Sequence, residues 1–174
     1  MTVFRLVDED PAKYDVVDNF KALFMMSDVR FITPDPKHVG LTEGEIGIMD
    51  FSGFSFRHFL KVATNLSSTR LYLRYVQEAV PFKIFQNHFV NCSPILTRIM
   101  TLIRPFVKKE LFDVMHFHTS GYESLYKHVP RDVLPEEYGG YAGKFDDLFE
   151  EYKRTLYAEK DYIKDDSNWQ LYDD

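Results

Sequence analysis

Four short apolar runs along the chain have the pattern of β-strands, and segments with helical patterns separate them. The runs are Val3–Val7, Glu45–Phe51, Phe82–Val90 and Val114–His118. In the second run, Ile46 and Ile48 share one face of the strand. Met49 and Phe51 share the other face, so both faces are apolar. This pattern is typical of a strand in a sheet that helices cover on both sides.

The segments between these runs carry apolar residues at helical spacing. In residues 14–30, Val17, Phe20 and Phe24 lie three and four positions apart and share one helix face. Further helical patterns cover residues 56–80, a short stretch at 120–129 and an acidic amphipathic stretch at 146–164. Residues 33–44 and 134–143 are predicted loops because of their Pro and Gly content. The alternation of strands and helices predicts an α/β fold with a mostly parallel sheet.

The segment from Ser93 to Leu111 combines an apolar stripe with a basic end. Ser93 followed by Pro94 fits a helix N-cap and a first helical position. The stripe consists of Ile95, Ile99, Leu102, Ile103 and Phe106. Pro105 removes a backbone donor and clashes with the preceding turn, so it should kink or break the helix. The stripe alone fits either a core helix or a segment that contacts more than its own protein.

Composition adds apolar mass and an uneven charge distribution. The 174 residues, about one domain, include 16 Phe and 11 Tyr, enough for a core and for the lining of a cavity. Net charge is −6, but residues 57–109 hold nine Lys and Arg against one acid, whereas residues 144–174 hold five against ten. The basic segment is either a set of solvated helix faces or a surface for anionic lipid headgroups. Nucleic acid is disfavoured, because the overall charge is negative and no recognition motif is present.

No set of residues assembles a catalytic site, a cofactor site or a metal site. Dinucleotide, Walker and nucleophile-elbow motifs are absent from the sequence. His116 and His118 share a strand face, but no third ligand stands at a suggestive spacing, so packing is the favoured role. Cys92, the single cysteine, excludes a disulfide framework and is expected to be buried. These observations favour a protein that binds an apolar ligand over an enzyme.

The chain also lacks the sequence signals of membrane insertion or secretion. No apolar run approaches the ~20 residues that a membrane span needs. The N-terminus has no basic region followed by an apolar core, as a signal peptide would. We therefore expect a cytoplasmic protein that is peripheral on membranes.

Several motifs in order resemble the CRAL-TRIO lipid-binding domain. They are GEIGIMDFSGFSF, VPFKIFQNHFVNCSPIL, IRPFVKKEL and, above all, LPEEYGG within MHFHTSGYESLYKHVPRDVLPEEYGG. The likeness covers about Val3 to Leu148 and is strongest to the tocopherol-transfer and retinaldehyde-binding branch, especially its insect members. It divides the chain into a lipid-binding domain at residues 1–148 and an acidic C-terminal helix and tail at 149–174. Family members usually have a helical domain before the first strand, and this chain starts at that strand.

The resemblance implies a carrier of one hydrophobic molecule, with no other cofactor. A sheet of about five strands would form the pocket floor, and helices would close it, with Ser93–Leu111 as a mobile gate that opens at a membrane. The residues at matching pocket positions are Phe20, Phe24, Met49, Phe54, Phe56, Tyr72, Tyr75, Val76, Val80 and Phe82.

The sequence departs from the family pattern at several of these positions. Phe54 stands where the family has Trp, Ser52 where it has an acid, and Phe20 and Phe24 where it has two serines. A polar handle for a hydroxylated ligand such as tocopherol is therefore lost.

Basic residues that grip phosphoinositide phosphates in the family are matched only in part. Lys83 matches one such residue, whereas two others fall on Glu110 and Val114. Arg104, Lys108 and Lys109 are the candidates to replace them as contacts for anionic headgroups.

Two functions follow as hypotheses. The first is an intracellular carrier, a monomer, that transfers a retinoid, a tocopherol or another lipid between membranes and contacts an anionic surface, including phosphoinositides. The second is a membrane-targeting or protein-interaction module whose pocket is filled and which transfers nothing.

Overall fold

The computed structural model describes residues 1–33, 43–80, 82–165 and 167, without the side chains of Ile95, Thr97, Leu102 and Ile103. The predicted loop at 33–44 and the end of the predicted C-terminal tail lie largely outside these residues. The described part has one parallel sheet in chain order, made of β1 (Thr2–Arg5), β2 (Gly44–Asp50), β3 (Lys83–Val90) and β4 (Met115–Phe117). The α/β prediction is therefore confirmed, with one correction, because four strands are described and not about five. After β4 the described residues form 3-10 turns and then helices, and they add no further strand to the sheet.

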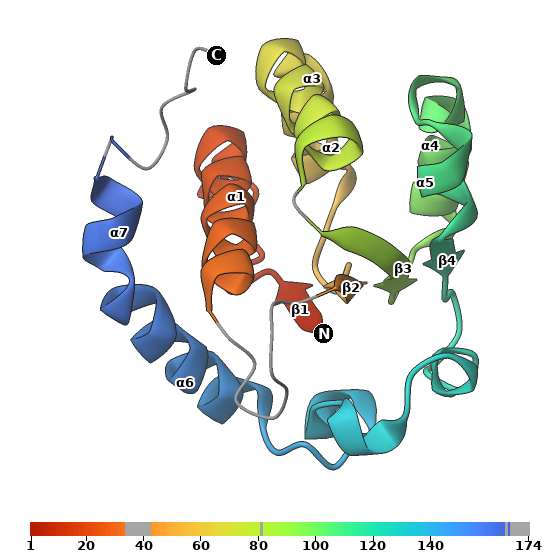
Figure 1. Ribbon diagram of the computed structural model, residues 1–174. Coiled ribbons are helices and arrows are strands. Elements are labelled where there is room, and N and C mark those ends of the chain that lie inside the picture. The colour runs from red at the N-terminus through yellow and green to blue at the C-terminus, as the bar shows by residue number, and fades with distance from the viewer. Residues whose placement is uncertain (34–42, 81, 166, 168–174) are drawn as a thin grey trace.

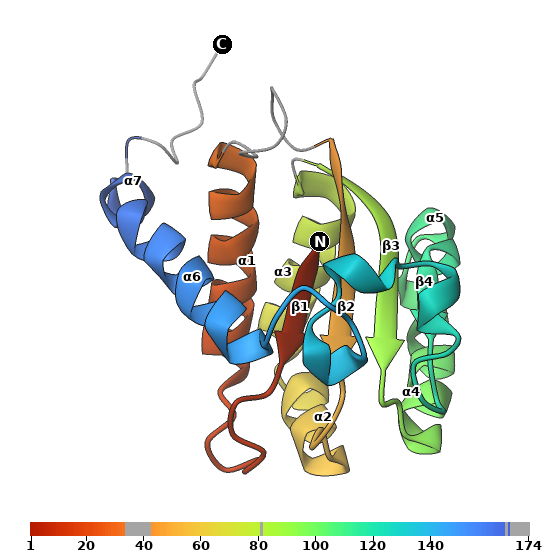
Figure 2. The same ribbon diagram turned by 90° about the horizontal axis from the view of Figure 1, so that it is seen from below.

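Helices cover one face of the sheet, which we call the helical face (Figures 1 and 2). They are α1 (Val16–Ile32), α2 (Phe56–Thr64), α3 (Leu66–Arg74) and α4 (Pro94–Ile103). The N-cap of α1 is Asp15, whose side chain accepts a hydrogen bond from the Asp18 backbone N–H at 2.9 Å. The last turn of α3 widens into a π-helix, η1 (Tyr75–Ala79). Such wide turns are rare in proteins, but those that occur often lie at functional sites.

The predicted start and break of α4 are both confirmed. The Ser93 hydroxyl accepts the Leu96 backbone N–H at 3.3 Å, and Pro94 occupies the first turn. The helix ends before Pro105, where the 3-10 turn η2 (Arg104–Phe106) follows. The short helix α5 (Lys109–Asp113) then leads directly into β4.

A second layer, the lower layer, packs against the opposite face of the sheet. It holds the 3-10 turns η3 (Leu125–Lys127), η4 (Arg131–Val133) and η5 (Glu136–Tyr138). The short helix expected at 120–129 is thus a single 3-10 turn. A Cβ on Gly140 would lie 2.0 Å from the Leu134 carbonyl oxygen, so this close approach requires glycine. Helices α6 (Phe145–Ala158) and α7 (Lys160–Lys164) follow and run beside α1 (Figure 1).

The two faces of β2 separate as the sequence predicted. Ile48, with Ile46 beside it, packs into a buried cluster with residues of the lower layer, including Leu134 and Tyr138. Met49 and Phe51 pack on the other side, against a cluster that includes residues of α4. No helix in the described residues is long and apolar enough to cross a bilayer.

Four histidines meet between the sheet and the lower layer. His116 and His128 lie 4.5 Å apart between ring centroids, and His88 lies 5.0–5.3 Å from the other three rings, those of His116, His118 and His128. The His88 Nδ1 and the His118 Nε2 lie 3.0 Å apart, within hydrogen-bond distance. The other ring nitrogen of His88 is hydrogen-bonded to the Gln86 side chain, and that of His118 to the Ser124 hydroxyl. Burial and the neighbouring rings lower the pKa of His88 to about 4, and burial lowers those of His116 and His118. Within the described residues, no three potential ligands are arranged to hold a metal ion.

Acid should weaken the fold through this histidine cluster. The unfolded chain protonates these side chains as the pH falls below about 6.5, whereas the folded cluster resists protonation. Stability is therefore fully present above pH 6.5 and is lost as the pH falls towards about 4, the pKa of His88. Urea unfolding between pH 7 and 4.5 should show a loss of about 1–2 kcal/mol from the cluster.

The His88→Gln variant isolates this contribution, because Gln keeps a neutral hydrogen-bonding group. It should be less stable than wild type at pH 7 and should lose less stability in acid. The half-buried His116→Gln variant is the milder alternative. If the free energy of unfolding falls as steeply with falling pH in both variants as in wild type, the histidine cluster is not the cause of the acid sensitivity.

Candidate ligand-binding site

Seven of the ten predicted pocket residues surround a small cavity between α1, η1 and the sheet. They are Phe24, Met49, Tyr72, Tyr75, Val76, Val80 and Phe82. The cavity has a volume of about 60 Å³. This is room for about two water molecules, each of which takes ≈ 30 Å³ of liquid volume. The structure thus brings these residues together around a small space.

Stacked aromatic rings explain why this cavity is small. Phe20 stacks on Tyr72 with ring centroids 4.5 Å apart and planes 5° apart. Phe24 packs on Tyr75 at 4.4 Å. The two Phe rings thus fill space that smaller side chains would leave open. Burial raises the pKa of Tyr72 and of Tyr75 to about 12, which keeps both phenols neutral.

A few polar groups also line the small cavity. The Tyr75 hydroxyl donates to an Asp28 carboxylate oxygen at 3.5 Å, next to Ser27 of the cavity wall. The Glu45 carboxylate accepts a hydrogen bond from the Thr2 hydroxyl, and burial raises the Glu45 pKa. Small-molecule sites usually have such a wall, mostly apolar with a few polar groups.

A larger cavity of about 600 Å³ adjoins the small one and shares four wall residues with it, Phe4, Leu23, Met49 and Tyr72. Its wall is formed by residues of β1, α1 and α6 among others. Figure 2 shows α1 and α6 side by side at the β1 edge of the sheet, although they are far apart in the sequence. The further apolar wall of the cavity includes Met26, Phe145, Leu148 and Phe149. Its volume lies within the ~300–1,000 Å³ that hold a single small ligand.

Two predicted pocket residues near α2 have different surroundings. Phe54 lines the larger cavity, where its ring lies 5.1 Å from His58 and 6.1 Å from Tyr14. Phe56 begins α2 and is 55% exposed. Together with Leu60, one turn further on and 43% exposed, it forms part of the molecular surface. Phe56 therefore lies outside both cavities.

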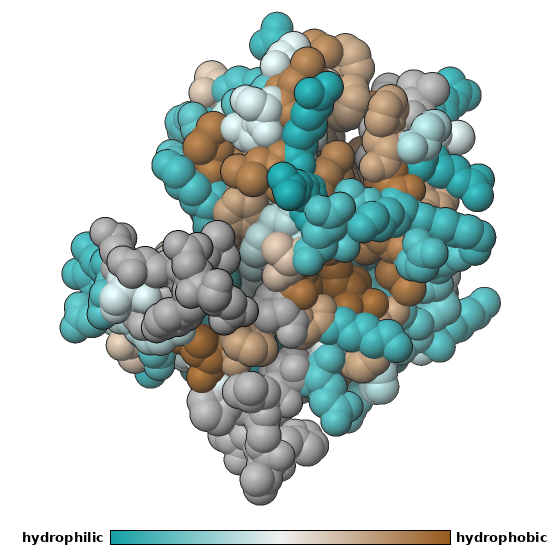
Figure 3. Space-filling view, turned by 45° about the horizontal axis from the view of Figure 1, so that its top comes forward, coloured by the Kyte–Doolittle hydropathy of each residue, from teal (hydrophilic) through white to brown (hydrophobic). Residues whose placement is uncertain are grey.

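The predicted gate helix α4 rests on the sheet through its inner face. Ile99 and Leu96 are buried, and Leu96 packs with Phe89 and Cys92. Phe106 is 75% exposed at the far end of the segment. The side chains of Ile95, Leu102 and Ile103 lie outside those that the structure describes. Figure 3 shows hydrophobic residues gathered between hydrophilic ones on the face of the molecule that it presents.

The end of the gate is attached to the π-helix η1. The Lys108 backbone N–H donates to the Gln77 side-chain oxygen at 2.7 Å. The Lys108 ammonium lies 3.3 Å from Glu78, which also pairs with Arg74 at 3.3 Å. The pKa of Glu78 is lowered by these partners, with Lys108 the largest influence. We call these contacts the latch.

Comparison with known proteins adds the family. The model of the CRAL/TRIO domain matches residues 1–140. The chain belongs to the CRAL/TRIO family. It is 28% identical over 158 residues to an alpha-tocopherol transfer protein-like protein of Mus musculus, covering 89% of this chain and 43% of that protein. It is 27% identical over 137 residues to clavesin-2 of Mus musculus, covering 79% of this chain and 40% of that protein.

The chain thus spans about two fifths of the length of these relatives. A solved structure titled Crystal structure of Sfh5 aligns with a TM-score of 0.47 and 18% identity, over 74% of this chain and 46% of that one.

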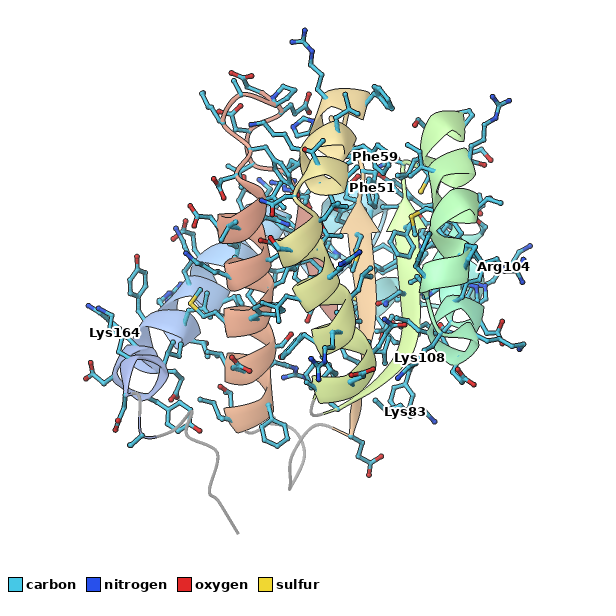
Figure 4. The ribbon with its side chains drawn as sticks, turned by 90° about the horizontal axis from the view of Figure 1, so that it is seen from above. Phe51, Phe59, Lys83, Arg104, Lys108 and Lys164 are labelled. Carbon is cyan, nitrogen blue, oxygen red and sulfur yellow. The ribbon has the colours of Figure 1, made fainter. Side chains whose placement is uncertain are left out.

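The basic residues predicted to contact headgroups lie towards one side of this CRAL/TRIO domain (Figure 4). Lys83, Lys108 and Arg104 appear together there, and Lys164 lies at the opposite side. The Lys83 ammonium and the Arg104 guanidinium lie over the rings of Phe85 and Phe112. Lys109 pairs with Asp113. Glu110 is exposed in the first turn of α5 and Val114 is its C-cap, so neither adds positive charge.

Apart from Met49, Phe54 and Tyr72, the sequence predictions missed the residues of the larger cavity, above all those on α1. Asn19, Ala22, Leu23, Met26 and Arg30 all line it. They are spaced by three and four residues, so they form one helix face. That spacing was a readable signal. The part of the wall formed by α6 could not be predicted in this way, because no local pattern shows that residues 145–152 reach the edge of β1.

Proposed function

We propose that this CRAL/TRIO domain carries one small hydrophobic ligand, a retinoid, a tocopherol or another lipid, between membranes. The ligand occupies the two adjoining cavities between α1, the sheet and α6. The observation that carries the proposal is the apolar cavity of about 600 Å³ joined to the small cavity of the predicted pocket residues. Burying an alkyl chain there gains about 0.8 kcal/mol for each CH₂ removed from water.

In this proposal α4 and α5 act as the gate, and an anionic membrane opens it. The ion pairs of the latch are exposed to solvent and are worth at most about 1 kcal/mol. Anionic headgroups compete with Glu78 for Lys108 and Arg74, while the exposed Phe106 can enter the headgroup region. Release of the latch then frees the chain between Arg104 and Lys109, where α4 has already ended at Pro105.

A second candidate is a membrane-targeting or protein-interaction module without a ligand. The close stacking of Phe20 on Tyr72 and of Phe24 on Tyr75, with only about 60 Å³ left between them and the sheet, favours this reading. The two candidates differ in whether the purified protein contains a lipid.

Extraction of the purified protein with organic solvent, followed by mass spectrometry, tests the proposal. We expect close to one lipid per chain, because a cavity of this volume holds one small ligand. If no lipid is found, and added retinoids, tocopherols and phospholipids do not bind, the carrier function is wrong. Salt-sensitive binding to anionic vesicles in that case would support the module.

The double variant Lys108→Glu, Lys109→Glu tests the membrane contact separately from the ligand. Each basic residue near an anionic surface contributes about 1 kcal/mol, so binding to vesicles rich in phosphatidylserine should weaken by at least roughly thirtyfold. Transfer of a fluorescent lipid between such vesicles should slow accordingly, while ligand binding in solution persists.

The double variant Lys160→Glu, Lys164→Glu is the matched control, because it makes the same charge change on α7, at the other side of the molecule (Figure 4). It should leave vesicle binding close to that of wild type. Equal losses in both double variants would show that net charge, and not the gate end, governs the membrane contact.

A further inference from the structure

Three charged side chains line the larger cavity, and two of them are already satisfied. The Arg5 guanidinium pairs with Asp146 at 2.6 Å and lies 3.9 Å above the ring of Phe145. The Asp50 carboxylate accepts hydrogen bonds from Asn91, from Tyr138 and from the Ser52 backbone N–H, at 2.8–3.0 Å. Neither group offers a free charge to a ligand.

Arg30 is the third charged side chain, and it differs from the other two in its lack of a partner among the described residues. It lies in the last turn of α1, is half-buried and lines the cavity. To the residues that the structure describes, its guanidinium makes no ion pair within 4.0 Å and no hydrogen bond. Its positive charge acts on Glu45 and on Tyr152. The Glu45 carboxylate already accepts the Thr2 hydroxyl, and the Tyr152 hydroxyl donates to the Met26 carbonyl oxygen at 3.2 Å.

Arg30 places a charge at one end of the cavity wall that α1 forms, and the rest of that wall is mostly apolar. The cavity-lining face of α1 runs from Asn19 to Arg30, about 16 Å at 1.5 Å per residue. Between these ends it presents Ala22, Leu23 and Met26. A partly desolvated guanidinium is stabilised by an anion that binds it with two parallel hydrogen bonds, as a carboxylate does.

We infer that the ligand is a single-chain carboxylic acid, such as a long-chain fatty acid, with its carboxylate on Arg30 and its chain along α1 towards Phe54. This inference rests on the carrier function proposed above and names the ligand class for the same cavities. A neutral alcohol or ester of the same chain would bury the same apolar surface and leave Arg30 without its partner. Arg30 therefore determines specificity between acids and their neutral analogues.

Fluorescence titration with cis-parinaric acid and with its methyl ester tests this inference, because the two probes share a chain and differ in charge. Wild type should bind the acid about ten- to a hundredfold more tightly than the ester, the range for a hydrogen bond to a charged group. Arg30→Gln should weaken the acid by that factor and leave the ester unchanged. Arg30→Lys, which keeps the charge, should retain part of the preference.

Arg70→Gln, an exposed change on α3 outside both cavities, is the control and should preserve the preference. Equal affinity of wild type for acid and ester, or an equal loss of both in Arg30→Gln, would overturn the inference and leave the carrier function standing. If neither probe nor any other lipid binds wild type, the carrier function falls together with the inference.

Discussion

The Asp50 carboxylate at the end of β2 holds together the parts of the structure that frame the site. It accepts hydrogen bonds from the Tyr138 hydroxyl of the lower layer, from Asn91 at the end of β3 and from the Ser52 backbone. Burial alone would raise the Asp50 pKa, but these donors bring it below its usual value. The same Asn91 adopts a left-handed backbone conformation just before α4. One anion thus fixes the lower layer, the turn into α2 and the start of the gate.

The two ends of the predicted gate segment are attached to the rest of the protein by contacts of different strength. Its beginning is anchored by Asn91, the Ser93 cap and the buried Leu96. Its end is held by the latch, whose ion pairs are exposed to solvent. A segment that is anchored at one end and held by exposed ion pairs at the other can move more easily at the second end, as the proposed opening at a membrane requires. The basic residues at the loose end are the ones that a negatively charged surface attracts.

Much of the fold was predictable because parallel strands and amphipathic helices leave local signals. The apolar run around Ile48, the Ser93–Pro94 start and the break at Pro105 each depend on neighbouring residues only. The fifth strand was not found among the described residues, and the short helix at 120–129 is a single 3-10 turn, because tertiary packing decides such short elements. Family likeness led to the residues around the small cavity. It did not indicate that Phe20 and Phe24 would nearly fill it, nor that the space would open beside β1, where α6 meets α1. Phe56 shows the same limit, since its position at the first turn of α2 turns it to solvent.

The central claim is that a lipid binds inside the molecule, between α1 and the sheet. Photocrosslinking with a lipid that carries a diazirine in its chain, followed by peptide mapping, tests it most directly. We expect crosslinks in α1, in β2 and in residues 72–80, and their suppression by excess unlabelled lipid. Crosslinks confined to the exposed surface of α2 and the region of Phe106 would contradict it.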